Sequence, residues 1–261
     1  NGRIYRMNVA LSVRGGQDVF QITPHLSVTV ADLNVVNGDR GILAQNGAGS
    51  LTIDGVQGVN FARSGFVSVD TSAFTIRNSA ASNATYGIFS ARVPSVIVEN
   101  TILTQNRIEG AQIQSTSSLL VSDVTASNNP WRGVSVFAAT GTTTFQNVTA
   151  TDNGIAGIGV FNGRTNLVIT DGSFTNNAFH GIDIGGVTDA TISNVVVAGN
   201  GSPQGGAQTG GAGIRAQTNL STATIRIEDS LIENNAEGFF GGGGVMIAGA
   251  TSAIIERSII R

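Results

Sequence analysis

The sequence predicts an all-β solenoid of about ten coils, each built from 22–24 residues and three short strands. Two periodic columns predict it. Glycines recur every 22 to 24 residues from Gly41 to Gly181, and the full series is Gly41, Gly65, Gly87, Gly110, Gly133, Gly157, Gly181, Gly213 and Gly244. Asparagines follow the same period at Asn37, Asn60, Asn83, Asn106, Asn129, Asn153 and Asn177. A repeat of this length is typical of stacked coils, each of which buries its apolar face only against its neighbours.

Each coil is expected to open with a short strand whose first and third side chains point inward, because alternate residues of a strand face opposite sides. These strands are Val28–Val30, Leu51–Ile53, Phe74–Ile76, Val96–Val98, Leu119–Val121, Thr143–Phe145, Leu167–Ile169, Ala190–Ile192 and Ala223–Ile225. The apolar first and third residues supply the predicted core.

A polar corner follows the opening strand, at Asp32, Asn78, Asn100, Asp123, Asn147, Asp171, Asn194 and Asp229. Asn and Asp suit corners because they tolerate left-handed backbone and bond neighbouring amides. A second strand such as Val148–Ala150 comes next. The asparagine column then forms a second corner, where stacked side chains are expected to bond one another as a ladder. The glycine strand, such as Gly157–Val160, closes the coil.

The whole chain, residues 1–261, is predicted to be one domain, with clear repeats from about residue 25. Two longer glycine-rich loops, at 200–213 and 235–244, leave from the same corner, and such loops on one face of a repeat array are common binding sites. Neither end resembles a polar cap. We therefore expect self-association through the terminal coils, or a place within a longer rod.

Composition excludes several classes of function. Hydrophobic residues make up 41% and charged residues 12%, so the chain has ample core material. The net charge of -3 gives no basic surface for nucleic acid. No apolar run approaches the roughly 20 residues of a membrane span. Cysteine is absent, and no metal-spaced His cluster or phosphate-binding loop occurs. We expect no nucleic acid, membrane span, metal or cofactor.

Three segments show the repeat most clearly: NVTATDNGIAGIGV from Asn147, SFTNNAFHGIDI from Ser173 and SLIENN from Ser230. They resemble the right-handed parallel β-helix repeats of pectate-lyase-like proteins, and the resemblance covers about residues 25 to 261. It implies a right-handed parallel β-helix, secreted to the cell surface or beyond, in a bacterium. Similar repeats occur in polysaccharide lyases, hydrolases, epimerases, phage tailspikes and bacterial surface proteins, so several functions stay open.

Candidate functional residues flank the glycine strands. The residue just before each glycine and the residue two positions after it should point to solvent. These two columns place Tyr86, Glu109, Arg132, His180, Asp183 and Arg215 on one face, which they are expected to share with Trp131. His180, oriented by Asp183, could move a proton beside a uronate whose carboxylate Arg132 and Arg215 neutralise. Trp131, Tyr86 and Glu109 would bind the sugar. The alternative is that Glu109 with Arg132, and Asp183 with Arg215, are ordinary ion pairs between neighbouring strands.

Three functions follow, in order of preference. The first is a structural or adhesive surface solenoid that assembles end to end. The second is a polysaccharide-modifying enzyme of the uronate lyase, epimerase or hydrolase type, or a carbohydrate-binding solenoid. The chain lacks the Asp-Pro-His-Asp motif of alginate epimerases and the calcium site of pectate lyases, and both absences count against the enzyme. A minor alternative is ice binding, through the outward residues Thr29, Thr52, Thr75, Thr144, Thr191 and Thr224, interrupted by Ile97, Leu120 and Val168.

Overall fold

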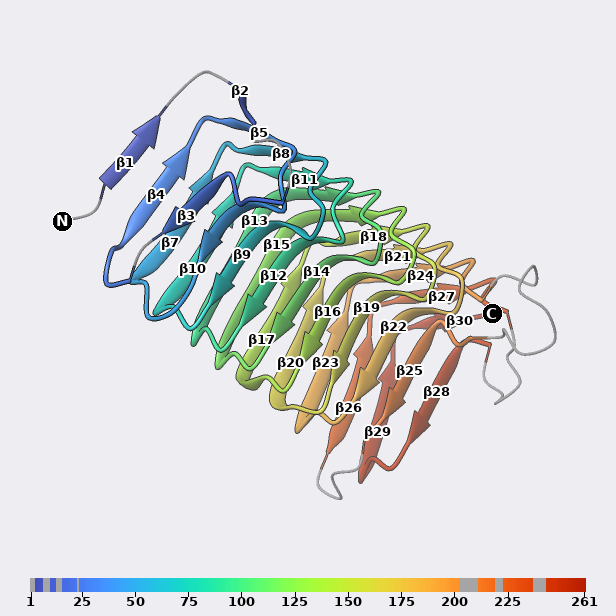
Figure 1. Cartoon of the computed structure of the whole chain (residues 1–261). Coiled ribbons are helices and arrows are strands. Elements are labelled where there is room, and N and C mark those ends of the chain that lie inside the picture. The colour runs from blue at the N-terminus through green and yellow to red at the C-terminus, as the bar shows by residue number, and fades with distance from the viewer. Residues whose placement is uncertain are drawn as a thin grey trace.

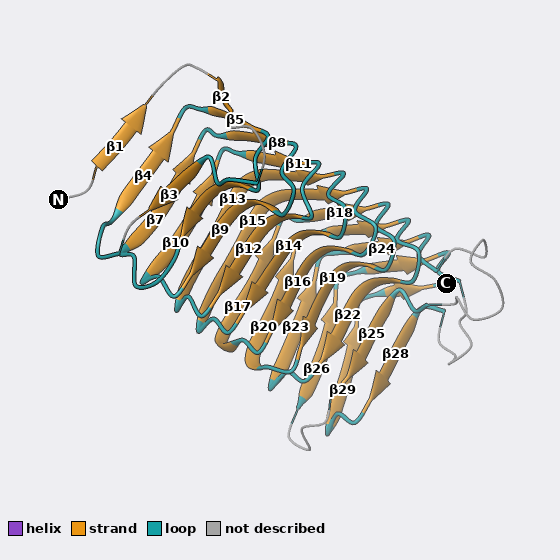
Figure 2. Ribbon diagram, in the orientation of Figure 1, coloured by secondary structure: helices purple, strands orange, loops and turns teal. Residues whose placement is uncertain are grey.

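The computed structural model describes residues 3–6, 10–12, 16–22, 24–201, 211–218, 223–236 and 243–261. In these ranges the chain winds into a stack of coils, with β1 (Arg3–Arg6) near one end and β28 (Val245–Ala248) near the other (Figure 1). Figure 2 shows strands joined by loops and turns, and the described residues form no helix. Every strand pairs in parallel with the equivalent strand of the neighbouring coils. The predicted fold class is confirmed.

The glycine strands form one ten-stranded sheet, whose outer surface we call the glycine face. Its strands are β3 (Phe20–Ile22), β6 (Arg40–Ala44), β9 (Ser64–Val69), β12 (Tyr86–Ala91), β14 (Glu109–Gln114), β16 (Arg132–Phe137), β19 (Ala156–Phe161), β22 (His180–Gly185), β25 (Ile214–Gln217) and β28.

The other two strands of each coil belong to a 20-stranded sheet that folds around a corner. The opening strands are β1, β4 (Val28–Ala31), β7 (Ser50–Asp54), β10 (Ala73–Arg77), β17 (Thr140–Gln146), β20 (Arg164–Thr170), β23 (Asp189–Ser193), β26 (Thr224–Glu228) and β29 (Ser252–Glu256). The second strands are β2 (Ala10–Ser12), β5 (Asn34–Val36), β8 (Gln57–Val59), β11 (Ala80–Ser82), β18 (Thr149–Thr151), β21 (Ser173–Thr175), β24 (Val196–Ala198), β27 (Leu231–Glu233) and β30 (Ile259–Ile260). Two strands, β13 (Ser95–Thr104) and β15 (Ser118–Ser127), run through the corner and join both parts.

The core is a set of columns of apolar side chains running along the stack. One column of the opening strands is fully aligned and buried, and comprises Val30, Ile53, Ile76, Val98, Val121, Phe145, Ile169, Ile192 and Ile227. Because each coil contacts only the coils above and below it, this burial is a nearest-neighbour contribution to stability.

One opening strand differs from the prediction. Ala190 pairs with Ile225 and Ile192 pairs with Ile227, so the inward residues of β26 lie two positions later than the pattern Ala223–Ile225 indicated. The reason is a longer connection between β25 and β26. Consequently Arg226, and not Thr224, continues the outward column of Thr191, which interrupts the threonine surface once more.

The first corner is built from left-handed residues, as predicted. Its Asp and Asn residues have φ near +55°, for example Asp123, Asn147 and Asp171. Their side chains bond between coils: Asn147 Nδ2 donates to Asp123 Oδ1 at 2.6 Å, and Asn194 Nδ2 donates to Asp171 Oδ1 at 2.6 Å. These bonds tie consecutive coils together at the surface.

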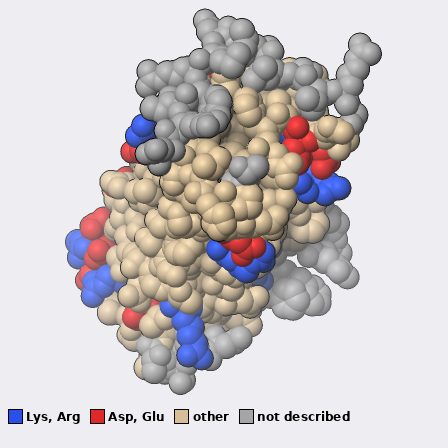
Figure 3. All heavy atoms as spheres, turned by 60° about the vertical axis from the view of Figure 1, so that its left-hand side comes forward, with Lys and Arg blue, Asp and Glu red and all other residues tan. Residues whose placement is uncertain are grey.

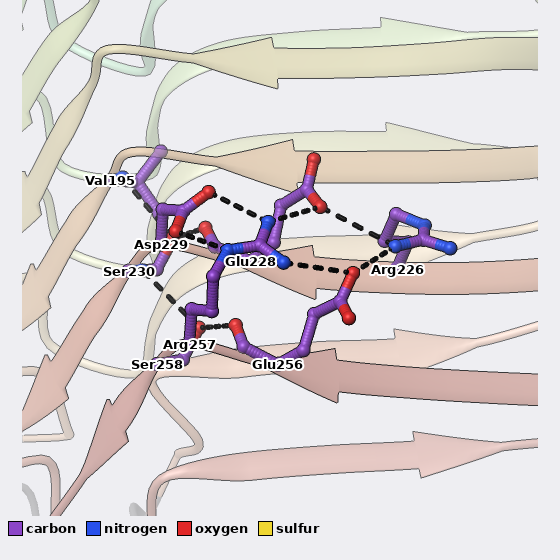
Figure 4. A network of polar contacts seen from close by, with 8 residues as sticks. All are labelled: Val195, Arg226, Glu228, Asp229, Ser230, Glu256, Arg257 and Ser258. Carbon is purple, nitrogen blue, oxygen red and sulfur yellow. Dashed lines mark hydrogen bonds and ion pairs between the residues drawn. The ribbon is translucent and has the colours of Figure 1, made fainter.

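In the last coil, Arg257 occupies the corner position that Asp or Asn occupies in the coils just before it. Arg257 is also left-handed and binds Asp229 with two nitrogens, at 2.7 and 2.9 Å. The same guanidinium contacts Glu228 and Glu256, and Arg226 reaches these two glutamates from the other side (Figure 4). Each of the five charged groups has an opposite charge as a neighbour, so the network joins β26 to β29 and offers no free carboxylate cluster.

The second corner contains a buried asparagine ladder. The backbone N–H and the Nδ2 of Asn106 both donate to Oδ1 of Asn129, at 3.0 and 3.2 Å. The pattern repeats along the stack through Asn106, Asn129, Asn153, Asn177, Asn200 and Asn235. The predicted ladder is thus present for Asn106, Asn129, Asn153 and Asn177.

Three of the predicted ladder residues do not belong to it. Asn37, Asn60 and Asn83 are exposed residues in left-handed conformation. Strand register places Asn83 beside Gln105, so it is Ala84 that precedes Asn106 in the ladder column. The prediction was wrong by one residue here, because the coil between Asn83 and Gln105 is one residue shorter than the uniform spacing of 23.

The regular spacing of the glycines within this sequence has a cause in the packing at this corner. A Cβ on Gly157 would lie 2.7 Å from the carbonyl oxygen of Gly181, 3.1 Å from Asn177 Nδ2 and 3.2 Å from Ala150 Cβ. Only glycine lets the backbone approach the ladder this closely. The predicted loops at 200–213 and 235–244 lie largely outside the described residues.

Candidate functional site

The glycine face aligns the predicted site residues in two columns. Strand register places Tyr86 beside Glu109, Arg132 two coils from His180, and Asp183 beside Arg215. The inward residues between them, such as Ile182 and Ile184 on β22, fill the core. The sheet therefore holds these polar side chains on one rigid surface, as the sequence predicted.

Asp183 and Arg215 form a two-pronged ion pair across neighbouring coils. Nε and Nη2 of Arg215 donate to the two carboxylate oxygens of Asp183, at 2.7 and 2.9 Å. Asp183 points outward, yet its side chain is only 3% exposed, because the arginine lies over it. Paired charge-assisted bonds of this geometry are strong and directional. Within the described residues no side chain bonds Nη1 of Arg215.

Glu109 is the most buried acid of the face. It accepts a bond from Ser135 Oγ at 2.6 Å and from Arg132 Nη1 at 3.3 Å. Burial raises the pKa of Glu109, while Ser135 and Arg132 act in the opposite direction. Ser135 and Arg132 cover the carboxyl group of Glu109. This carboxyl group therefore fixes the position of the Arg132 side chain.

Arg132 lies flat across the neighbouring coil. Its guanidinium carbon is 4.8 Å from the centre of the Phe161 ring, a cation–π contact. The space exists because Gly159 has no side chain: a Cβ there would lie 2.9 Å from Arg132 Cδ. Phe137 adds a second ring, 5.5 Å from that of Phe161. Together these side chains make a flat aromatic surface with a positive charge on it.

His180 is anchored to the backbone of the next coil. Nδ1 of His180 lies 3.0 Å from the backbone N and 3.2 Å from the backbone O of Ala212, so it accepts from the N–H in one tautomer and donates to the carbonyl oxygen in the other. Burial lowers the pKa of His180 more than the nearby Asp183 raises it. The backbone of Ala212 thus engages Nδ1, and Nε2 is the ring nitrogen that remains for a ligand.

The Asp183 carboxylate bonds Arg215 instead of orienting His180. The pair His180 and Asp183 thus lacks the contact that the sequence hypothesis assigned to it. The geometry instead matches the alternative of ion pairs between neighbouring strands for Asp183 with Arg215 and for Glu109 with Arg132.

A hollow of about 550 Å³ opens beside Arg215, and we call it the Arg215 hollow. It is lined by Phe161, Asn162, Gly163, Arg164, Ile184, Gly185, Gly186, Arg215 and Gln217. Sequence reasoning missed Arg164 and Phe161, because it followed the columns only two residues beyond each glycine. The aromatic pair at the fourth position, Phe137 and Phe161, was the available signal.

Trp131 borders the glycine face and does not enter the Arg215 hollow. Its side chain is exposed on the turn before β16, where the backbone N–H of Trp131 donates to the carbonyl oxygen of Ile108 at 2.9 Å. Ile155 and Phe179 occupy the same turn of the following coils. The result is an apolar ridge along the edge of the face, with Trp131 as its most exposed side chain.

Tyr86 lies on β12, one coil before Glu109. Its ring centre is 5.8 Å from that of Phe89. Burial and the negative charge of Glu109 raise the pKa of Tyr86, so its hydroxyl group stays protonated. It belongs to a different part of the face from Arg215.

The remaining surface has few charges. Figure 3 shows one side of the molecule, where uncharged residues predominate and acidic and basic groups lie beside one another. The described residues contain no group of three or more side chains placed to hold a metal ion, and among them no helix is long and apolar enough to cross a membrane.

Residues 18–174, more than half of the chain, match the family model for a right handed beta helix region. The chain belongs to the right-handed β-helix family. Its fold is also that of a solved pectate lyase. No curated protein sequence matches it.

Solved β-helix structures resemble it at low sequence identity. The A-module of mannuronan C-5 epimerase AlgE4 from Azotobacter vinelandii has a TM-score of 0.63 at 17% identity, over 90% of this chain and 65% of the module. Pectate lyase Pel9A has a TM-score of 0.64 at 13% identity, over 100% of this chain and 70% of the lyase. The periplasmic alginate epimerase AlgG has a TM-score of 0.54 at 11% identity, over 100% and 78%. At these identities the likeness shows the fold alone.

Proposed function

We propose that this β-helix binds an acidic polysaccharide on its glycine face, as an adhesive carbohydrate-binding protein of the cell surface. The observation that supports this most is the Arg215 hollow. It combines two arginines with a phenylalanine wall and a floor of glycines. A sugar ring can stack on Phe161 while its carboxylate meets a guanidinium.

The charges of the hollow favour a carboxylate ligand. Arg164 is exposed, and within the described residues no acidic side chain pairs with it. Two of the five N–H donors of Arg215 bond Asp183, which fixes the plane of the guanidinium, while Nη1 has no bonding partner among the described residues. An arginine held in place in this way loses less freedom on binding a ligand.

Binding is favoured over turnover by the state of the titratable groups. Asp183 is held by Arg215, Glu109 is covered by Ser135 and Arg132, and Nδ1 of His180 is engaged by the backbone of Ala212. A general base needs a free lone pair within reach of the proton that it removes. The three similar structures described above are named for action on mannuronan, alginate or pectate, and these polyuronates are the first ligands to test.

The test is a binding titration of the purified protein with polymannuronate, pectate and a neutral glucan. We expect the two polyuronates to bind and the neutral chain not to. Arg164→Ala and Arg215→Ala should each weaken binding about 10- to 100-fold, since a bond to a charged group contributes about 1.5–3 kcal/mol. Arg77→Ala is the matched control, because Arg77 pairs with Asp54 at the first corner, away from the glycine face.

Two outcomes would contradict the proposal. Equal affinity for neutral and acidic chains would remove the role of the arginines. New unsaturated ends or epimerised residues in the incubated polyuronate, abolished by His180→Ala, would show an enzyme of the lyase or epimerase type instead of a binding protein.

A further inference from the structure

A second hollow lies on the glycine face, nearer its N-terminal end. It has a volume of about 390 Å³, and we call it the Tyr86 hollow. Leu43, Val67 and Phe89 form its floor, and Arg40, Arg63 and Tyr86 form its rim. Leu43 and Val67 point away from the core but are only 1% and 4% exposed, because the rim side chains cover them.

The lining of the Tyr86 hollow fits a sugar that carries a negative charge. The apolar floor and the paired rings of Tyr86 and Phe89 offer a surface for the face of a sugar ring. Arg63 contacts Asp39 through Nε at 3.2 Å, and its side chain remains mostly exposed. Its other nitrogens can donate to a carboxylate. A pocket of this size, largely apolar with a few polar groups at its rim, is typical of ligand sites.

Both hollows lie on one continuous sheet. Phe161 on β19 is three strands beyond Tyr86 on β12, and Arg215 on β25 is five strands beyond it. At about 4.8 Å per strand these separations are about 14 Å and about 24 Å. The surface between them carries Gln112 and Phe137, a polar and an aromatic side chain suited to sugar hydroxyls and ring faces.

We infer that the Tyr86 hollow is a second subsite for the same acidic polysaccharide, so that the glycine face selects chains long enough to occupy both hollows. This inference rests on the proposed function. Two observations support the second subsite. Arg63 has the charge that an acidic sugar requires, and the glycine face is continuous between the two hollows. Once one end of a chain is bound, the second hollow is filled in an intramolecular step, which raises affinity without a new kind of contact.

The experiment is a calorimetric titration with size-defined oligouronates, from the dimer to chains longer than the span between the hollows. The parent should show a rise in affinity of at least about tenfold once the oligomer is long enough. Tyr86→Ala and Arg63→Ala should each reduce that rise severalfold. Thr75→Ala, on the opening-strand face, should bind like the parent at every length, and circular dichroism should show that all variants are folded.

The outcomes separate the two proposals. If the parent binds no oligouronate, the proposed function fails. If the parent binds but its affinity grows without a step, or if both rim variants keep the step, the second subsite is wrong while binding at the Arg215 hollow stands.

Discussion

At the level of single residues, the main finding is that the acids of the glycine face are covered by arginines. Asp183 and Glu109 occupy outward positions, where a side chain would ordinarily meet solvent, yet both are almost fully buried. The long arginine side chains lie along the sheet and keep only part of their guanidinium groups in water. The face thus presents cations to a ligand and hides its anions.

His180 gives the first prediction at this scale. Burial lowers its pKa below the usual value of 6.5, so the unfolded chain takes up this proton at a higher pH than the folded protein. The stability contribution is therefore present above pH 6.5 and is lost as the pH falls through the folded pKa. His180→Asn removes this proton uptake.

We expect the urea midpoint of the parent to fall more steeply below pH 6.5 than that of His180→Asn. The measurement is a series of urea unfolding curves across this range, followed by circular dichroism. Parallel pH dependence in the two proteins would show that the ring is not buried as described.

At the level of elements, the second corner carries two adjacent asparagine positions with different tasks. Asn128 is exposed and left-handed, whereas Asn129 is buried and bonded in the ladder. The first needs an unusual backbone angle, and the second needs an amide side chain. Substitutions at the two positions should therefore have different consequences.

Asn129→Ala should destabilise the protein by about 1–3 kcal/mol, because it leaves the buried donors of Asn106 without their acceptor. Asn128→Gly is the matched control in the same coil and should be close to neutral, since glycine adopts positive φ without strain. Denaturant midpoints measure both. Equal midpoints for Asn129→Ala and the parent would contradict the ladder.

The same adjacency explains what the sequence could and could not predict. Periodicity is enough to predict coils, because glycine and asparagine recur wherever the backbone must approach the ladder or turn sharply. It cannot decide which of two adjacent corner positions is buried, and Asn83 was misplaced because it takes the exposed position while Ala84 precedes Asn106 in the ladder column. The candidate columns were predictable from alternation along the strands. Arg164 was not, because it lies at the start of β20, outside the glycine strands whose columns carried the prediction.

At the level of the whole molecule, the last strands of the stack leave apolar side chains in solvent. Ile259 on β30 is 57% exposed, and its neighbour Ile260 and Ile255 on β29 are also exposed. Parallel strands with unpaired edges readily add further strands. End-to-end association of copies of this chain therefore stays a prediction.

Ile259→Asp should shift the protein towards smaller species in sedimentation velocity across a concentration series, because a charge would then have to be buried between coils. Ile102→Asp is the matched control: Ile102 is 51% exposed but lies on the side of the stack, on β13. A parent protein that sediments as a monomer at every concentration would contradict this prediction.

The asparagine ladder also gives the stack a direction. In each step the backbone and side-chain donors of one coil point to the acceptor oxygen of the next coil along the chain, from Asn106 through Asn200. In the coils that carry the ladder, the backbone N–H at this corner therefore points to the next coil and the Oδ1 acceptor points to the preceding coil. Two such coils are complementary only when they meet head to tail. The molecule is a polar rod in the sense used for filaments, and a coil added to it fits in one orientation alone.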